Sequence, residues 1–274
     1  MKTYIWCGLT LIVLCSATSS RGDFIIAHSG ATDPTTEGFG QLTVPPPSTA
    51  APLINDQGND AWSITGTGQA SQVVYTSGPF SPAQNADIAN QGFELTLTAR
   101  PVQALALPYD NLNPVVISGA AVDTGARRFD VQLGLDANGD TVVVLPTSIS
   151  IGPGGSIYAP GPNYTLVGSG SSYHVYRLVY DPATQLADLI VDGVERLSNY
   201  AGHTTNVVDF GLMWGAYSGG QGNFSLVELA STAIPEPSAL LLAATGLGVW
   251  PLLRRNRRAR HNRDVRFQRP QHRG

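Results

Sequence analysis

The sequence predicts an all-β fold, an antiparallel sandwich, for the central part of the chain on three observations. Several short segments alternate strictly between apolar and polar residues. The 274 residues include 30 glycines and 19 prolines, which is typical of many turns. Only 13% of the residues are charged, and no segment has the pattern of a long soluble helix. A coiled coil and a helical bundle are therefore excluded, and about 210 residues form one domain of sandwich size.

The clearest strand is Phe93–Arg100, in which every second residue is apolar and the residues between are polar. Because side chains alternate across a strand, this pattern predicts one buried and one exposed face. A second alternating segment, Phe129–Leu135, precedes an Asn138-Gly139 pair and the segment Thr141–Leu145. Asn-Gly favours a hairpin turn because both residues tolerate positive φ.

A further hairpin is predicted from Tyr173–Tyr180, the turn Asp181–Gln185 and Leu186–Val191, which ends at Asp192-Gly193. Residues 45–47 and 152–162 are expected to be surface loops. No fixed-period repeat occurs, which argues against a propeller or solenoid. The remaining predicted strands cover residues 62–66, 72–76, 115–119, 207–216 and 223–229.

Residues 1–21 have the layout of a secretory signal peptide, with Lys2 near the start, an apolar run and then small residues. We expect cleavage after Ala17 by signal peptidase, or a few residues later. A lipid on Cys15 is an alternative, although Leu14 occupies a position where a small residue is expected. Both cysteines of the chain, Cys7 and Cys15, lie in this segment, so we expect no disulfide in the mature protein.

The other end has three parts in order: Pro235-Glu236-Pro237, an apolar run over residues 238–253, and an arginine cluster that starts at Arg254 and Arg255. As a helix at about 1.5 Å per residue the run would extend about 24 Å, slightly less than a bilayer core. Arginines after a membrane span hold that end in the cytoplasm. The preceding domain would then face outward, in agreement with the signal peptide.

These three parts closely resemble the PEP-CTERM sorting signal of bacterial surface proteins. The resemblance covers residues 233–260 and implies a transient transmembrane helix, recognition by an exosortase-type protease, cleavage near the triplet, and release to the cell surface or an extracellular matrix. The late Pro251 and a basic tail over residues 261–274, which we expect to be disordered, depart from the usual pattern.

Arginines in the tail could indicate nucleic-acid binding. However, residues 22–237 carry five arginines against 19 acidic residues, and such an acidic domain would repel phosphates. We therefore expect no nucleic-acid partner, and we interpret the arginine cluster as a determinant of membrane topology.

From Tyr173 to Leu229 the sequence also resembles concanavalin A-like, laminin-G-like jelly rolls. The resemblance rests on residues 176–182, 187–195, Phe210-Gly211 and the glycine-rich segment 215–224. It implies a jelly-roll sandwich with a shallow concave sheet that often binds glycans, and several members of the superfamily bind calcium. A fold alone establishes neither property.

Candidate glycan-binding residues are aromatic rings, which stack on sugar CH faces, and an amide that pairs with hydroxyl groups. Trp62, Trp214, Tyr217 and Asn223 are of these types, although core packing explains the two tryptophans equally well. Calcium is possible at the oxygen-rich segment 55–60. The spacing of Asp136, Asn138 and Asp140 resembles a calcium loop, but a hairpin explains it better.

Ordinary enzyme chemistry has little support in the sequence. A polysaccharide hydrolase needs two carboxylates flanking the scissile bond, and the closest candidates are Asp188 and Asp192. A hairpin turn at Asp192 with Asp188 facing solvent is the better interpretation. The histidines at 28, 174 and 203 lack metal-ligand spacing, and no nucleophile motif occurs.

The sequence thus predicts an exported, non-enzymatic surface or matrix protein without a metal site. A lectin-like carbohydrate-binding module and a polysaccharide hydrolase are the alternatives, and extracellular polysaccharide is a possible partner in either case.

Overall fold

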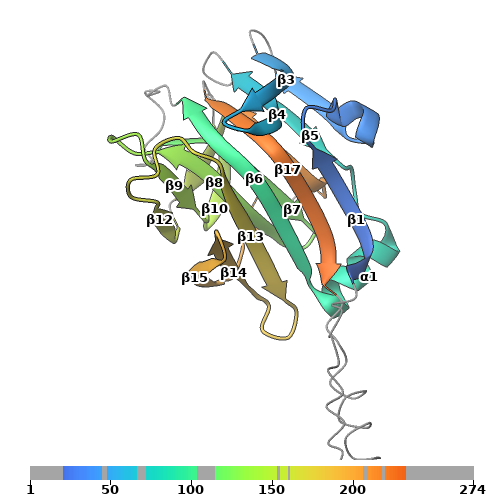
Figure 1. Cartoon of the computed structure of the whole chain (residues 1–274). Coiled ribbons are helices and arrows are strands. Elements are labelled where there is room, and N and C mark those ends of the chain that lie inside the picture. Colours follow the sequence, from blue (N-terminus) through green and yellow to red (C-terminus); the bar gives the residue numbers. More distant parts are fainter. Residues whose placement is uncertain are drawn as a thin grey trace, which may run out of the picture. The chain divides into compact units, whose positions relative to one another are not determined.

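Two large antiparallel sheets form most of the computed structural model (Figure 1). The structure describes residues 21–44, 48–66, 72–103, 115–152, 155–159, 161–205, 209–217 and 220–232. The predicted all-β antiparallel sandwich is therefore confirmed. The predicted signal peptide with Ala17, and the sorting signal with Pro235, Glu236, Pro237, Arg254 and Arg255, lie outside the described residues.

The sheet that faces the viewer in Figure 1, here called sheet A, has eight strands. Its long strand β17 pairs with β6 on one side, and on the other side with β4 and then with β1. In spatial order the strands are β15 (Val194–Tyr200), β14 (Leu186–Val191), β13 (His174–Asp181), β6 (Phe93–Gln103), β17 (Gln221–Thr232), β4 (Asn59–Gly66) and β3 (Ser48–Asp56), with β1 (Arg21–Ser29) beside β17.

The second sheet, sheet B, has seven strands and lies behind sheet A in Figure 1. Its order is β12 (Asn163–Thr165), β9 (Thr141–Val144), β8 (Arg128–Leu135), β7 (Val115–Asp123), β16 (Gly211–Tyr217), β5 (Gln72–Thr76) and β2 (Gly40–Val44). A separate two-stranded ribbon joins β10 (Ser148–Gly152) and β11 (Gly155–Ala159). The helices described are η1 (Pro34–Glu37) and α1 (Pro82–Gln91).

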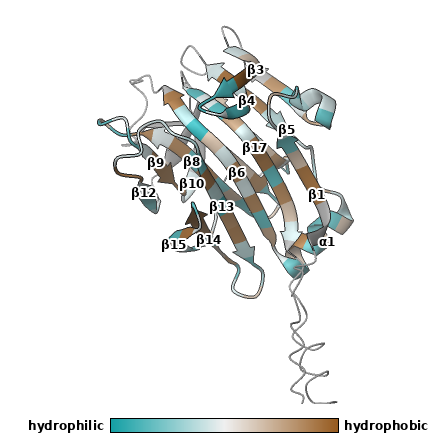
Figure 2. Ribbon diagram, in the orientation of Figure 1, coloured by the Kyte–Doolittle hydropathy of each residue, from teal (hydrophilic) through white to brown (hydrophobic). Residues whose placement is uncertain are grey.

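The core lies between the two sheets and follows the alternation seen in the sequence. In β6 the side chains of Phe93, Leu95 and Leu97 are fully buried, as predicted, while the intervening residues are half-buried. Figure 2 shows the same alternation of hydrophobic and hydrophilic residues along the strands of sheet A. The largest fully buried side chains include Trp214, Tyr75, Tyr176, Phe93, Phe129 and Phe224.

Two predicted hairpins are confirmed, and one of them uses different turn chemistry. Asp192 and Gly193 both have positive φ, 51° and 79°, as a two-residue hairpin turn requires. Between β8 and β9 only Gly139 has positive φ, 82°. There the carboxylate of Asp136 accepts hydrogen bonds from the backbone N–H groups of Asn138 and Asp140, so an Asx-type turn closes the hairpin.

Several elements differ from the predictions. Residues 155–159, expected within a loop, form β11 and pair with β10. The strands β1, β2, β3, β10, β12 and β15 were not predicted. Nor was α1, whose sole buried residue is Ile88 and which therefore lacks an apolar stripe. Its signal was the capping box, in which Ser81 and Gln84 bond each other's backbone with Pro82 at the first turn.

No helix in the described ranges is long and apolar enough to cross a membrane. The predicted membrane span over residues 238–253 lies outside those ranges.

Candidate functional site

The two tryptophans predicted as a sugar platform lie in the core. Trp62 is 6% exposed, and its Nε1–H donates to the hydroxyl of Tyr75 at 2.9 Å. Trp214 is fully buried, with its ring stacked on His28 and Tyr75 at centroid distances of 4.7 and 4.9 Å. Stacking on a sugar requires an exposed ring face. The platform is therefore wrong for these residues, and core packing is the correct alternative.

The other two predicted glycan-binding residues have different outcomes. Tyr217 belongs to β16, but its side chain lies outside the described part of the structure. Asn223 is fully buried in β17, between Arg100 of β6 and Ser63 of β4. Its Nδ2 donates to Asp56 at 2.7 Å, which places it in a larger polar network.

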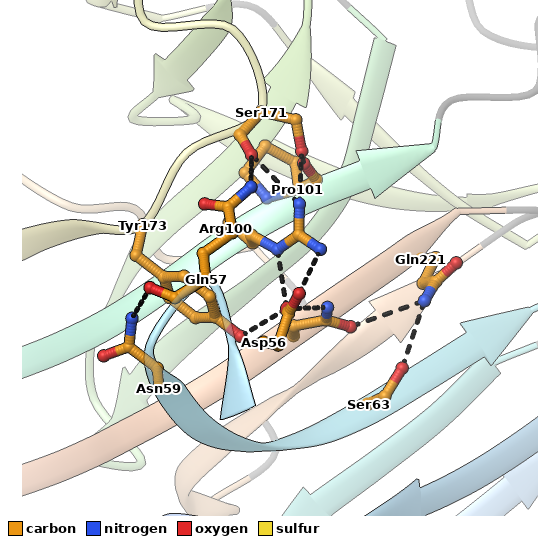
Figure 3. A network of polar contacts seen from close by, with 10 residues as sticks. Asp56, Gln57, Asn59, Ser63, Arg100, Pro101, Ser171, Tyr173 and Gln221 are labelled. Carbon is orange, nitrogen blue, oxygen red and sulfur yellow. Dashed lines mark hydrogen bonds and ion pairs between the residues drawn. The ribbon is translucent and has the colours of Figure 1, made fainter. Parts of the chain in front are cut away.

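This Asp56 network gathers residues from four strands and a loop around one carboxylate (Figure 3). Arg100 donates to both carboxylate oxygens of Asp56 through Nε and Nη2, at 2.8 and 2.7 Å, and the hydroxyl of Tyr173 donates at 2.9 Å. With the amide of Asn223, the carboxylate accepts four hydrogen bonds. Further members of the network are Gln57, Asn59, Ser63, Ser171 and Gln221.

The network joins the end of β3 to strands β6 and β17 and to the loop before β13. Burial alone would raise the pKa of Asp56, but hydrogen bonds from Arg100, Asn223 and Tyr173 outweigh burial and hold that pKa below its ordinary value. The carboxylate is thus charged and fully used. Asp60, the other acid of the predicted calcium segment, accepts the backbone N–H of Asn55 at 2.9 Å. Hairpin contacts therefore account for both acids without a metal.

The second calcium candidate is the β8–β9 turn. Asp136 caps its own turn, and the carboxylate of Asp140 accepts the backbone N–H groups of Gly168 and Gly170 at 2.9 Å each. These two hydrogen bonds lower the pKa of Asp140. The hairpin interpretation therefore explains this spacing. Within the described ranges, no group of three or more His, Cys, Asp or Glu residues is placed to hold a metal.

The carboxylates of the two candidate hydrolase acids accept hydrogen bonds from backbone N–H groups. Asp192 accepts the N–H of Val175 at 2.9 Å and contacts Nδ1 of His174 at 2.7 Å. Asp188 accepts the N–H of Asn199 at 2.9 Å. These contacts agree with the hairpin interpretation and give neither acid a catalytic geometry.

A buried ionic cluster on β8 was not anticipated. Asp130 is fully buried, accepts hydrogen bonds from Nε and Nη2 of Arg128 at 2.9 and 2.8 Å, and contacts Nε2 of His203 at 2.8 Å. Burial favours a raised pKa, but the Arg128 charge and the hydrogen bonds from His203 and Arg128 hold the pKa of Asp130 below its ordinary value.

This cluster resembles part of a hydroxyl–imidazole–carboxylate triad, because the hydroxyl of Thr205 lies 3.2 Å from Nδ1 of His203. The carbonyl oxygen of Thr205 lies closer to the same nitrogen, at 3.0 Å. Both ring nitrogens of His203 are therefore engaged, Nε2 by Asp130 and Nδ1 by the carbonyl oxygen and the hydroxyl of Thr205. The arrangement joins segment 201–205 to β8, to which His203 also forms an isolated bridge at Arg128.

An open pocket of about 550 Å³, here called the end pocket, lies between α1 and the turn at the end of β13. It is assembled from four segments that lie far apart in the sequence: α1, the β7–β8 turn with the start of β8, the β13–β14 turn, and segment 201–205. Its lining residues are Asn85, Ile88, Ala89, Thr124, Ala126, Arg127, Phe129, Tyr180, Gln185 and Thr204.

Four polar side chains of the end pocket have groups without partners, unlike those around Asp56. Within the described ranges, the side chains of Gln185 and Thr204 and the hydroxyl of Tyr180 form no hydrogen bond, and Oδ1 of Asn85 is buried without a partner. Arg127 donates from Nη1 to the carbonyl oxygen of Ala201. The pocket therefore offers donors and acceptors to a ligand.

The tyrosine of the end pocket packs against two buried aromatic rings. The ring of Tyr180 stacks on Phe93 at 5.2 Å and contacts Phe129 at 4.9 Å. Burial raises the pKa of Tyr180, and the positive charge of Arg127 opposes that effect. The phenol is therefore protonated at neutral pH and able both to donate and to accept.

The two turns that contribute to the end pocket are held by their own hydrogen bonds. The hydroxyl of Thr124 donates to the carbonyl of Arg127 and accepts from its N–H, at 3.0 and 3.2 Å. In the β13–β14 turn, the N–H of Gln185 donates to the carbonyl of Asp181 at 2.8 Å, and Gln185 has φ of 59°. Positive φ is costly for a residue with a side chain, so the turn holds Gln185 in a strained conformation.

No protein-family model and no curated protein matches this chain. Among solved structures, similar ones include a carbohydrate esterase from the Shiga toxin-encoding bacteriophage phi24B, with 9% identity, a TM-score of 0.53 and coverage of 76% of this chain and 98% of that one. Another is the winged bean acidic lectin complexed with methyl-α-D-galactose, with 12% identity, a TM-score of 0.43 and coverage of 76% and 98%.

A legume lectin-like domain from Entamoeba histolytica has 8% identity and a TM-score of 0.43, and the alignment covers 74% of this chain and 95% of that one. Identities this low transfer no residue role and no activity. The likeness to the esterase shows that the two chains share a β-sandwich fold.

Proposed function

We propose that this chain is an exported, non-enzymatic bacterial surface or matrix protein whose β-sandwich binds a saccharide in the end pocket. The observation that supports binding is the set of unpartnered polar groups beside a tyrosine: Asn85, Gln185, Thr204 and the Tyr180 hydroxyl. Sugars present many hydroxyl groups together with apolar CH faces, so a site with amides, hydroxyls and aromatic carbon suits them.

The size of the end pocket agrees with a short saccharide. A volume of about 550 Å³ lies within the range of small-ligand sites. The pocket is open and is lined by α1, two turns and segment 201–205, so a ligand can reach it from solvent. The concanavalin A-like resemblance of residues 173–229 supports the same ligand class by analogy.

Binding without hydrolysis is proposed because the candidate acids are already engaged. Asp188 and Asp192 hold backbone N–H groups, and none of the described residues that line the end pocket is an acid. Hydrolysis of a glycosidic bond needs an acid and a second carboxylate near the scissile bond.

Two matched glutamine variants test the binding proposal. Gln185 and Gln57 are both exposed and both have positive φ, 59° and 51°, but only Gln185 lines the end pocket. The full chain would be applied to a glycan array and then titrated with the best ligand. We expect Gln185→Ala to weaken binding by about tenfold, since an amide hydrogen bond is lost, and Gln57→Ala to bind normally. Equal binding by both variants would place the site elsewhere.

The sorting part of the proposal rests on the sequence of the two ends, with Ala17 as the signal-peptide cleavage position. We propose that signal peptidase removes residues 1–17 and that an exosortase-type protease cleaves near Pro235-Glu236-Pro237, with Arg254 and Arg255 holding the helix in the membrane beforehand. Mass spectrometry of the mature protein from surface and medium fractions tests this. A C-terminus near the triplet that disappears in Glu236→Ala is expected, whereas a tail intact through Gly274 would mean a permanent anchor.

A further inference from the structure

The arginines of the acidic domain are almost all held by other residues. Residues 22–237 contain five arginines against 19 acidic residues, and the structure describes all five arginines. Three form ion pairs and one lies over an aromatic ring. These are Arg100 with Asp56 at 2.7 Å, Arg128 with Asp130 at 2.8 Å, Arg177 with Glu94 at 2.6 Å, and Arg196 over Tyr164 at 4.8 Å.

Arg127 is different from these four. Within the described ranges it has no carboxylate at ion-pair distance, and its one side-chain hydrogen bond goes to the carbonyl of Ala201. A backbone carbonyl does not neutralise a guanidinium group, and one such bond leaves most of its five N–H groups free. In a domain with nearly four acids for every arginine, an arginine without an acid needs an explanation.

Its position supplies an explanation, because Arg127 is the sole charged residue among the described residues that line the end pocket. The Thr124 hydroxyl fixes its backbone on both sides, so the charge is presented by an ordered turn. The phenol of Tyr180 lines the same pocket, and its pKa, raised by burial, is also influenced by two opposite charges, Arg127, which lowers it, and Asp181 of the β13–β14 turn, which raises it.

The Asp56 network shows what this combination of groups binds. There an arginine, a tyrosine hydroxyl and an asparagine amide converge on one carboxylate (Figure 3). The end pocket contains the same three groups in Arg127, Tyr180 and Asn85, but no acid. The missing partner of such a set is an anion supplied from outside.

We propose that the end pocket selects a sugar residue that carries one carboxylate, a hexuronate at the end of a glycan, with Arg127 binding the carboxylate. This inference rests on the proposed function of the same pocket. Arginine favours a carboxylate because its planar N–H groups match the two oxygens. The 19 acids of the domain repel polyanions at long range, which favours a terminal residue with a single charge over a highly charged chain.

Matched pairs of methyl glycosides test the proposal. The full chain would be titrated with methyl glucuronide and methyl glucoside, and with the corresponding galacto and manno pairs, in low and high salt. We expect the uronide of at least one pair to bind about tenfold more tightly than its neutral partner, with the difference smaller in high salt. Glucose 6-sulfate, as a further arm, distinguishes a carboxylate site from a general anion site.

Variants of two arginines then show whether the uronide preference depends on Arg127 or on the overall charge of the domain. Arg127→Gln should abolish the uronide preference, and Arg127→Lys should retain part of it. Arg177→Gln, which removes the same charge from a paired arginine outside the pocket, should keep the preference in full. Thermal unfolding of each variant identifies any loss that comes from misfolding.

The possible results distinguish the two proposals. If neutral and acidic sugars bind equally and Arg127→Gln changes nothing, the uronate inference is overturned while saccharide binding stands. If the sulfate binds as well as the uronide, the carboxylate selectivity is overturned. If no member of any pair binds the wild-type chain, both the uronate inference and saccharide binding in the end pocket are overturned.

Discussion

The Asp56 network and the end pocket are built from the same kinds of side chain, yet they have opposite properties. Each has an arginine, a tyrosine hydroxyl and an amide, but only the network has an acid at its centre. Around Asp56 four hydrogen bonds close the network on itself. Around Arg127 and Tyr180 the polar groups stay open to a space of about 550 Å³. The presence of one carboxylate therefore separates a structural clamp from a candidate binding site.

This difference predicts where mutations change stability and where they change binding. In the closed network each removed group leaves partners that are buried and unpaired, which is costly. In the open pocket the side chain of Gln185 is exposed and Arg127 has no ion pair, so removal of either should cost little stability. The following predictions start with the largest expected effect.

Removal of the central acid should have the largest effect. Asp56→Ala leaves the fully buried amide of Asn223 and the guanidinium of Arg100 without their partner. We expect a loss of about 3 kcal/mol in the free energy of unfolding, measured by urea denaturation. A loss below about 1 kcal/mol would mean that the network holds the hairpin only weakly.

Lowering the pH should reversibly reduce the free energy of unfolding, because two ion-paired acids lose their charge. The folded-state pKa values of Asp56 and Asp130 lie below those of ordinary aspartates, near 3.9. Their contribution is therefore complete above about pH 4 and is lost as the pH falls below that value toward the folded-state pKa. Urea midpoints from pH 7 to pH 2.5 should be steady at first and then fall. In Asp56→Asn the fall should be shallower, and an unchanged slope would contradict the assignment.

Relief of backbone strain should have a smaller effect of the opposite sign. Gln185→Gly and Gln57→Gly each replace a residue with positive φ, and each should raise the free energy of unfolding by about 0.5 to 1 kcal/mol. The gain should be smaller for Gln57→Gly, which also loses the hydrogen bond from Gln57 to Ser171. Only Gln185→Gly should weaken saccharide binding, because only Gln185 lines the end pocket. Thermal unfolding with and without ligand measures both quantities, and equal binding by the two variants would remove Gln185 from the site.

The smallest stability effect is expected at the pocket arginine. Arg127→Gln removes a hydrogen bond to Ala201 but breaks no ion pair, so the free energy of unfolding should change by less than about 0.5 kcal/mol. Urea denaturation beside Asp56→Ala makes the comparison direct. A loss as large as that of Asp56→Ala would show that Arg127 is structural, and the two regions would then be alike.

Local patterns in the sequence predicted much of the sandwich. Strict alternation identified β6 and its buried face, and the Asp192-Gly193 pair identified a hairpin turn. The helix α1 was not predicted because only one of its residues is buried, so its sequence shows no apolar periodicity. Its capping box was the signal that the sequence offered. For Trp214 the sequence left sugar stacking and core packing open, and the structure decides for the core, because its ring packs against His28 and Phe224 of sheet A.

The sequence by itself determined the strand pattern, the acidic charge of the domain and the predicted targeting segments at both ends, because each depends on residues close together in the chain. Only the tertiary structure decided which polar groups are paired. Asp56 meets Arg100 and Asn223, and Arg127 lines one pocket with Tyr180 and Gln185, through the packing of strands and turns that are distant in sequence. Whether a polar group is a clamp or a binding site depends on those partners, and local sequence does not specify them.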